Sequence, residues 1–307
     1  MTARRRKAPD NAVFKLDMPL GGAGLCVIAD SPHSGTVYPE DMGYACDRHE
    51  LRKAEDCHVD TLFDFLPALG VPFLQAKVSR AYVDANRRDR VTARYKKEGD
   101  GVYAPPPSGL VRGECTPRSK LPVYDRPLSL KEVFNRVAKY HKPYHVRLKK
   151  MANAARDAHG RVVHLNCHSM PSRLRGGTVK NKWDVILGMR GGTTCAPEIT
   201  KKLQELFAQK GYRVGIDIRG FSGAEIVRRN GRPKERRHSI QIELNRALYM
   251  DEDTLDLTPA AQKLKADLQD IMRDFVAWCG DNVPPVLPPG GAAPSPARHG
   301  GKGRGPV

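Results

Sequence analysis

The sequence predicts a single α/β domain with a mixed, mostly parallel sheet flanked by helices. Short apolar runs bounded by turn-forming residues alternate with longer segments whose apolar residues recur every three or four positions. No internal repeat interrupts this alternation, which is typical of α/β domains. Hydrophobic residues make up 40% of the 307 residues and charged residues 28%, ordinary values for a globular protein.

The first half of the chain predicts two strands and two helices. Residues 25–29 (LCVIA) are a short apolar run that ends at Asp30, which indicates a buried strand followed by a loop. Residues 56–69 place apolar residues on one helical face, with Asp56 or Glu55 as the acidic residue at the helix start. Residues 72–76 predict a second strand, and residues 130–155 a long basic amphipathic helix.

The second half predicts four strands and two helices. The strands are expected at residues 161–167, 184–188, 212–216 and 238–244, and the helices at residues 196–209 and 259–278. Residues 88–125 have no clear period and carry Gly and Pro, so we interpret them as a long excursion near the functional face.

Composition divides the chain into three parts. We expect a basic flexible arm at residues 1–11, a folded catalytic domain at 12–280, and a disordered tail rich in Pro and Gly at 281–307. The basic start is not followed by the apolar stretch of a signal peptide, and no run could span a membrane, so we expect a cytoplasmic protein. Seven widely spaced cysteines without a CxxC pair favour reduced thiols over a disulfide framework.

The formal charge of +18 leaves two kinds of partner open. The runs RRRK at 4–7 and RRNGRPKERR at 228–237 favour nucleic acid. The aromatic share of 7% and the lack of a recognisable nucleic-acid-binding motif argue against it. A small anionic substrate is the other interpretation of the charge.

Three polar residues stand at or near the ends of predicted strands: His33 in SPHSG, His168 in NCHSM and Glu243 in QIELNR. Ligands bind at strand ends in open α/β sheets. Two histidines with carboxylates match the ligands of a catalytic zinc site, although a hydrogen-bonded loop histidine is the common alternative for each.

Glu243 lies in a strand-like run and shares one face with Gln241. A buried carboxylate there would need a cation or a raised pKa, which is the setting of a general base. The alternative is an edge strand with a solvated face. Arg80, Asn86 and Arg87 in SRAYVDANR could clamp a substrate carboxylate, or could form an ordinary basic surface loop.

From about residue 28 to residue 250, the chain resembles the N-formylglutamate amidohydrolase family. The matching segments, in order, are SPHSG (31–35), EDCHVDTLFDF (55–65), SRAYVDANR (79–87), GLVR (109–112), PVYDRPLS (122–129), YHKPYH (140–145), HSMPS (168–172), DVILG (184–188), FSGAEIVRRNG (221–231) and HSIQIELNRALYM (238–250).

The resemblance implies a phosphorylase/hydrolase-like fold, as in zinc carboxypeptidases and aspartoacylases, with one Zn²⁺ per chain. It implies His33, Asp56 and His168 as the metal ligands. The relatives use an HxxE pair, but Thr36 stands at the acidic position here, so Glu55 and His58 are rivals of Asp56.

The resemblance also implies zinc-dependent hydrolysis of N-formylglutamate to glutamate and formate, the last step of a histidine-degradation pathway. Glu243 would act as general base, and Arg80 would stabilise the oxyanion with zinc. Asn86 and Arg87 would grip one substrate carboxylate, and Arg228 or Arg229, in a loop expected at FSGAEIVRRNG, a second.

The sequence departs from the family pattern at three places. Asn166 stands where Asp is expected two residues before His168, Met189 follows DVILG where Asp is common, and Ser222–Gly223 replaces a Gly-Gly pair. Another N-acyl amino acid or a peptide therefore stays an alternative substrate, and ligand binding without turnover a further alternative. His141 and His145 share one helical face, where packing and hydrogen bonding are favoured over metal binding.

Overall fold

The computed structural model describes residues 13–19, 24–94, 101–116, 118–174 and 177–283. The predicted arm at 1–11 and residues 284–307 of the predicted tail lie outside the described residues. Residues 281 and 282 belong to the last helix, so the helix continues past the predicted domain boundary at residue 280. Within the described part of the chain, none of the helices combines the length and apolar character that a membrane span requires.

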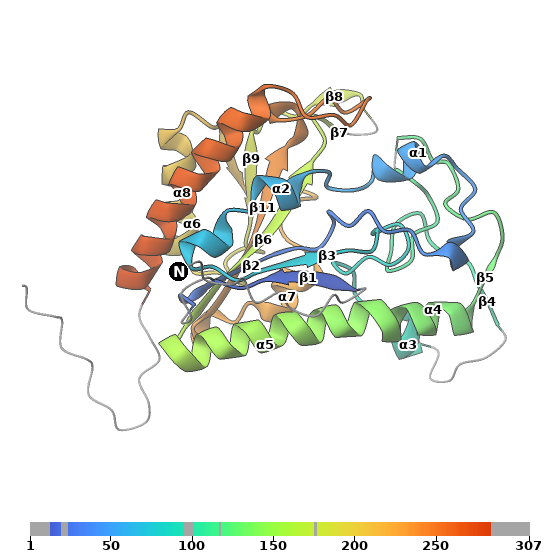
Figure 1. The fold of residues 1–307 in the computed structure, drawn as a ribbon, viewed down its shortest axis with the longest axis horizontal. Coiled ribbons are helices and arrows are strands. Elements are labelled where there is room, and N and C mark those ends of the chain that lie inside the picture. Colours follow the sequence, from blue (N-terminus) through green and yellow to red (C-terminus); the bar gives the residue numbers. More distant parts are fainter. Residues whose placement is uncertain (1–12, 20–23, 95–100, 117, 175–176, 284–307) are drawn as a thin grey trace, which may run out of the picture.

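A seven-stranded sheet forms the centre of the molecule (Figure 1). Its order in space is β1 (Phe14–Asp17), β3 (Phe73–Ala76), β2 (Val27–Ser31), β6 (Val162–Met170), β11 (Arg237–Asn245), β9 (Val185–Gly188) and β10 (Val214–Ile216). The four strands from β3 to β11 are parallel, β1 is antiparallel to β3, and the parallel pair β9 and β10 is antiparallel to β11. The predicted mixed, mostly parallel sheet is confirmed.

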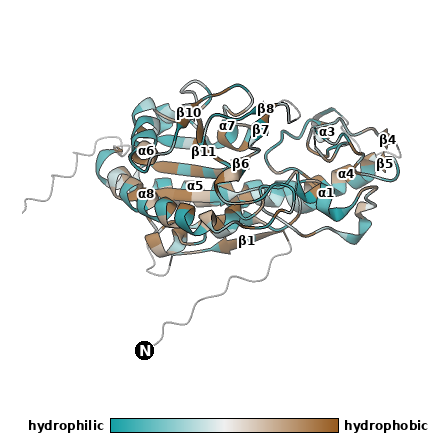
Figure 2. Cartoon of the chain, turned by 90° about the horizontal axis from the view of Figure 1, so that it is seen from above, coloured by the Kyte–Doolittle hydropathy of each residue, from teal (hydrophilic) through white to brown (hydrophobic). Residues whose placement is uncertain are grey.

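Helices cover both faces of this sheet (Figure 1). On one face, α2 (Val59–Leu62), η2 (Leu66–Leu69), α6 (Pro197–Gln209) and α8 (Ala260–Asn282) share one hydrophobic core with the strands. On the other face, Tyr144 and Leu148 of α5 (Lys142–His159) pack with Ile28 and Leu74. The short helix α7 (Glu225–Asn230) adds Ile226 to the same cluster. Figure 2 shows the hydrophobic strands enclosed between helices whose outer turns are hydrophilic.

A second, smaller core lies beside the sheet, at the end where α4 (Leu130–Arg136) projects (Figure 1). Helix α4 begins with a capping box between Ser129 and Glu132 and continues through a π-helical turn, η3 (Val137–His141), into α5. The predicted helix 130–155 is therefore confirmed, with one irregular turn. The remaining elements are η1 (Glu40–Met42), α1 (Arg48–Arg52), α3 (Val91–Arg94), β4 (Val102–Tyr103), β5 (Leu128–Ser129), β7 (Arg173–Leu174), β8 (Val179–Lys180), η4 (Pro233–Glu235) and η5 (Arg246–Leu248).

Three expectations about local structure are wrong. The helix expected at 56–69 is two short pieces, because the chain turns after Leu62 and resumes as a 3-10 helix with Pro67 near its start, so Asp56 precedes the helix. The FSGAEIVRRNG segment contains helix α7. His168 lies inside β6, which extends to Met170, because the strand stays paired with β11 along its whole length.

Candidate active site

The carboxyl ends of the parallel strands meet at one edge of the sheet, as expected for a ligand site. A cavity of about 950 Å³ opens there. His33 follows β2, and His168 and Glu243 lie near the ends of β6 and β11. Asp56 lines the cavity from the segment before α2. The backbone N–H of Asp56 donates to the carbonyl of His33 at 3.1 Å.

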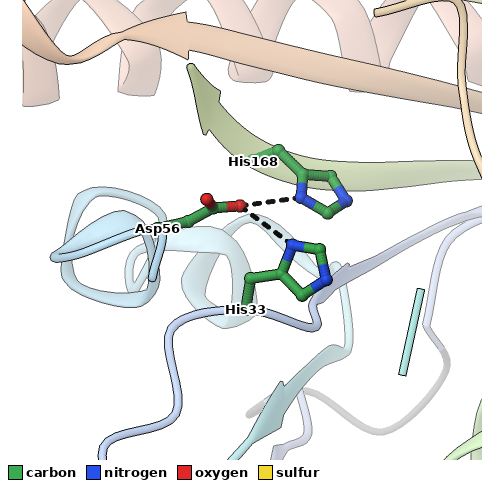
Figure 3. Close-up of side chains that lie close together, drawn as sticks. All are labelled: His33, Asp56 and His168. Atoms are coloured by element: carbon green, nitrogen blue, oxygen red, sulfur yellow. Dashed lines mark hydrogen bonds and ion pairs between the residues drawn. The ribbon is translucent and has the colours of Figure 1, made fainter. Parts of the chain in front are cut away.

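His33, Asp56 and His168 come together on the cavity wall (Figure 3). Their candidate ligand atoms all lie within 4.8 Å of one another. Asp56 Oδ2 is 3.3 Å from Nδ1 of His33 and 2.8 Å from Nδ1 of His168. All three residues are at most 2% exposed. Among the described residues, this is the one group of three such side chains close enough to share a metal ion.

The far sides of both rings contact oxygen acceptors. His33 Nε2 lies 2.7 Å from Asp84 Oδ1, and His168 Nε2 lies 2.8 Å from Asn166 Oδ1. When each Nε2 carries the proton, each Nδ1 directs a lone pair toward the Asp56 carboxylate. Burial lowers the pKa of His168, although the Asp56 carboxylate opposes this, and a neutral ring is the form that binds metal. Buried acceptors that converge in this way fit a cation.

Two amides of fixed orientation face His168 Nε2. Asn166 donates from Nδ2 to Asp30 at 2.7 Å, which turns its oxygen toward the ring. Asn86 accepts from the Ile226 backbone at 2.8 Å, which turns its Nδ2 toward the ring at 3.0 Å. The oxygen of Asn166 accepts from His168 when the proton is on Nε2, which leaves Nδ1 free to bind a metal. The amide of Asn86 can donate to Nε2 only in the other tautomer, in which the proton is on Nδ1. Asn166, a departure from the family pattern, therefore still orients this ring.

The rivals of Asp56 lie outside the ligand group. Glu55 accepts hydrogen bonds from Ser79 Oγ at 2.6 Å and from the Tyr38 hydroxyl, and burial raises its pKa to about 7. His58 Nε2 contacts the Leu255 carbonyl at 2.8 Å. Neither side chain joins His33 and His168.

Buried Arg246 holds the Asp56 segment in place. Its Nη1 donates to the Lys53 carbonyl at 2.9 Å, and its Nη2 donates to the Glu55 carbonyl at 2.6 Å. Nη2 also lies 3.4 Å from Asp56 Oδ1. The sequence assigned no role to Arg246, because a buried arginine that binds distant backbone carbonyls leaves no local pattern.

Glu243 faces the cavity from the middle of the sheet. Its neighbours β6 and β9 exclude the edge-strand alternative. Gln241 shares its face, as strand alternation predicted, and donates to Glu243 Oε1 at 2.6 Å. Burial raises the pKa of Glu243 well above its ordinary value, the Asp56 carboxylate raises it further, and Arg80 opposes them. A carboxyl group with a raised pKa is suited to proton transfer.

Arg80 lines the cavity and is fixed by Asp84. Its Nη2 and Nε lie 2.7 and 3.2 Å from Asp84 Oδ2, while the other oxygen of Asp84 contacts His33. Asp84 thus joins a cavity arginine to a ligand histidine. Asp84 was not predicted as a site residue, although it lies between Arg80 and Arg87 in SRAYVDANR.

Arg87 and Arg112 also line the cavity, and among the described residues neither forms a salt bridge with a carboxylate. Arg112 is buried, and its Nε donates to the Glu114 carbonyl at 2.9 Å. Burial lowers the pKa of Arg112 to about 10, and the neighbouring Arg80 lowers it in the same direction. Two positive charges without a carboxylate partner make the cavity suitable for an anion.

Three of the residues predicted to bind substrate have other surroundings in the structure. The polar atoms of Asn86 are engaged by Ile226, His168 and Gln241, so this side chain orients its neighbours instead of presenting free donors. Arg228 and Arg229 line a separate cavity beside α5, and Arg228 pairs with Glu225 at 2.7 Å. They lie on the outer side of α7, a helix where the sequence predicted a loop.

The other two departures from the expected family pattern, Met189 and Ser222–Gly223, lie next to the end of β9. Met189 is half-buried against the main core, and its backbone N–H donates to Asp217 at 2.8 Å. Gly223 has a φ of +100° and its neighbour Ser222 lines the cavity. A Cβ on Gly188 would lie 2.7 Å from the Gly223 nitrogen, so this close approach requires glycine.

The prediction that His141 and His145 form hydrogen bonds agrees with the structure. His141 Nε2 contacts the Arg87 carbonyl at 3.0 Å and His145 Nε2 the Ala85 carbonyl at 2.9 Å, so this pair braces the loop that carries Asn86. Cys57 and Cys167, which adjoin two of the ligands, are buried thiols.

An α/β sheet that gathers two histidines, a carboxylate, a buried glutamate and unpaired arginines at its strand ends is typical of a metal-dependent hydrolase. The family model of N-formylglutamate amidohydrolase matches residues 25–250, so the chain belongs to this family.

The comparison with known proteins includes one solved structure and two curated relatives. The chain is 34% identical to the crystal structure of N-formylglutamate amidohydrolase from Ralstonia eutropha JMP134, with a TM-score of 0.78 and coverage of 87% of this chain and 98% of that one. The N-formylglutamate deformylase of Pseudomonas aeruginosa is 27% identical over 82% of this chain and 93% of its own length. That of Pseudomonas putida is 29% identical over 73% and 81%.

Proposed function

We propose that this protein hydrolyses N-formylglutamate to glutamate and formate. The observation that carries the proposal is the His33–Asp56–His168 cluster, which shares one cavity with Glu243 and unpaired arginines. Family membership and the names of the relatives support the same reaction. The catalytic domain, predicted at residues 12–280, then extends to the end of α8 at Asn282, and we propose a cytoplasmic location, where thiols stay mostly reduced.

We propose one Zn²⁺ per chain as the cofactor, held by His33 Nδ1, Asp56 and His168 Nδ1. Two imidazoles and a carboxylate are donors that zinc accepts, and three protein ligands leave a position open for catalysis. A bound zinc ion would supply Lewis acidity, which polarises the amide carbonyl and lowers the pKa of water. Asp84 and Asn166 would hold the rings in the tautomer that binds metal.

Glu243 and Arg80 carry the proton transfer and the charge stabilisation. Glu243 takes a proton from the attacking water and gives it to the amine nitrogen as the C–N bond breaks. Arg80, fixed by Asp84, presents a positive charge to the oxyanion that forms on the former carbonyl oxygen.

Arg87 and Arg112 select an acidic amino acid. Both guanidinium groups lie in the cavity wall, and a substrate with two carboxylates can neutralise both. This assignment replaces Arg228 and Arg229, which line the other cavity.

A substrate panel tests the proposal. Metal-loaded protein is given N-formylglutamate, N-acetylglutamate, N-formylglutamine and N-formylalanine, and the release of amine is measured. The expected result is fastest turnover of N-formylglutamate. If none of the four is cleaved by protein that carries zinc, the proposed reaction is wrong.

A further inference from the structure

The cysteine pair Cys46 and Cys115 lies in the second, smaller core, and Thr116, which follows Cys115, lines the catalytic cavity. Their sulfur atoms are 2.6 Å apart, although 69 residues separate them in the sequence. Cys46 is half-buried and Cys115 is buried. The other five cysteines are buried, and among the described residues no hydrogen bond joins any two of them.

Backbone pairing sets the approach of the two sulfurs. The Ala45 N–H donates to the Val123 carbonyl at 2.9 Å, and the Cys115 N–H donates to the Leu121 carbonyl at 2.8 Å. Tyr44 and Tyr124 form an isolated bridge beside them. Because both segments are hydrogen-bonded to the same stretch, the thiols are held together by the fold.

We propose that Cys46 and Cys115 are a reversible oxidation site, at which a low-molecular-weight disulfide converts the two thiols into a protein disulfide. The half-buried Cys46 thiolate attacks one sulfur of the oxidant and releases the first small thiolate. Cys115 then attacks Cys46 of this mixed disulfide and releases the second. The two cysteines are oxidised, the oxidant is reduced, and the two released thiolates take up the two cysteine protons.

The local surroundings set the rate of this exchange. Burial raises the pKa of both thiols, and the Glu50 carboxylate acts in the same direction on each. The thiolate is the attacking form, so the exchange is slow at neutral pH and becomes faster as pH rises. Reversible pairs of this kind, formed under oxidising conditions, are the usual disulfides of cytosolic proteins.

The bond would join two walls of the cavity. Cys115 lies three residues after Arg112, and Cys46 precedes α1, after which Lys53 and Ala54 line the cavity. A disulfide has an S–S distance of about 2.05 Å, so the sulfurs need to move by only about 0.5 Å. We therefore expect oxidation to stabilise the folded protein and to leave the shape of the cavity unchanged.

Peptide mapping tests the site. The metal-loaded full-length protein is incubated with oxidised glutathione at pH 8.5, its remaining thiols are alkylated, and it is digested without reductant. The expected product is a linked pair of peptides that contain Cys46 and Cys115, lost after dithiothreitol. If Cys46 and Cys115 are both recovered in the alkylated form and no linked pair of peptides is found, the proposal is wrong.

Thermal unfolding gives a second readout. Oxidation is expected to raise the Tm of the wild-type protein by several degrees, reversibly with dithiothreitol. Cys46→Ser and Cys115→Ser should show no such rise. Because the reversal is measured in the wild-type protein, the test stands even if a variant folds poorly. An unchanged or lower Tm in protein that carries the linked peptides would contradict the stabilising role.

Discussion

Glu243 and His168 occupy directly paired positions on the neighbouring parallel strands β11 and β6. The distance between the proposed base and a proposed metal ligand is therefore set by the sheet and not by a loop. Gln241 and Asn166 form the next pair on the same face, two residues earlier. This register places the proton-transfer group, its hydrogen-bond partner and the ring-orienting amide on one rigid surface.

The first prediction concerns the zinc content of variants at the two proposed ligand histidines, His33 and His168. Protein purified without added metal is expected to carry about one zinc per chain, and His33→Ala and His168→Ala are expected to lose it, because two protein ligands bind zinc poorly. Elemental analysis of gel-filtered protein measures this. His58→Ala, which removes a half-buried histidine outside the cluster, is the matched control and should keep its zinc. A full zinc content in both ligand variants would contradict the assignment.

Arg112 is expected to recognise the second carboxylate of the substrate. Arg112→Met should reduce kcat/KM for N-formylglutamate by about 10- to 100-fold, because a charge-assisted hydrogen bond is lost. The reduction should be much smaller for N-formylglutamine, whose side chain is neutral. Arg228→Met, in the other cavity, serves as the control. Equal losses for both substrates would show that Arg112 only supports the fold.

The side-chain amide of Asn166 donates a hydrogen bond to the carboxylate of Asp30. The substitution Asn166→Asp would place two buried carboxylates in contact where the amide now donates at 2.7 Å. We expect this variant to lose about 2–3 kcal/mol of unfolding free energy, measured by urea denaturation. Asp30→Asn combined with Asn166→Asp restores a donor and an acceptor, and should recover part of the loss. A stable single variant would contradict this pairing.

Asp30 makes stability depend on pH. Burial alone would raise the pKa of Asp30, but His164, Asn166 and Tyr144 outweigh it and hold the pKa below its ordinary value. A carboxylate with a lowered folded pKa contributes stability above its unfolded pKa of about 3.9, and this is lost as pH falls through the folded pKa.

Asp30→Asn should therefore destabilise the protein most at pH 5–7, and the difference from wild type should shrink below about pH 4. Urea denaturation with EDTA at pH 7, 5 and 3 measures this. Asp64→Asn, which removes a surface ion pair with Lys265, is the control and should show little effect at any pH. A constant difference across this range would contradict the role of Asp30.

The sheet and the metal-binding cluster could be predicted from the sequence because their signals are local. Apolar runs predicted six of the seven strands of the main sheet, but not β1, whose sequence FKLD alternates apolar and charged residues. The alternation of Gln241 and Glu243 predicted their common face. The break of the 56–69 helix could not be predicted, because Val59, Leu62, Phe63 and Leu66 have the spacing of one helical face. All four are buried in the core although the helix is interrupted after Leu62.

The supporting residues of the site depend on contacts between distant segments. Asp84 contacts His33, which lies 51 residues away in the sequence, and Arg246 binds carbonyls more than 190 residues away. Arg228 and Arg229 were misplaced for the same reason, since their direction depends on how α7 packs. The charge of +18 likewise does not report on the site, because most basic residues lie outside the cavity.

The central claim is tested most directly by formate release from N-formylglutamate by Glu243→Gln, compared with wild type at equal zinc content. Glutamine keeps the shape of the side chain but cannot accept the proton from water. The account predicts a loss of about 10²- to 10⁴-fold in kcat, with zinc content and Tm unchanged. Formate release within a few-fold of wild type would show that Glu243 is not the base.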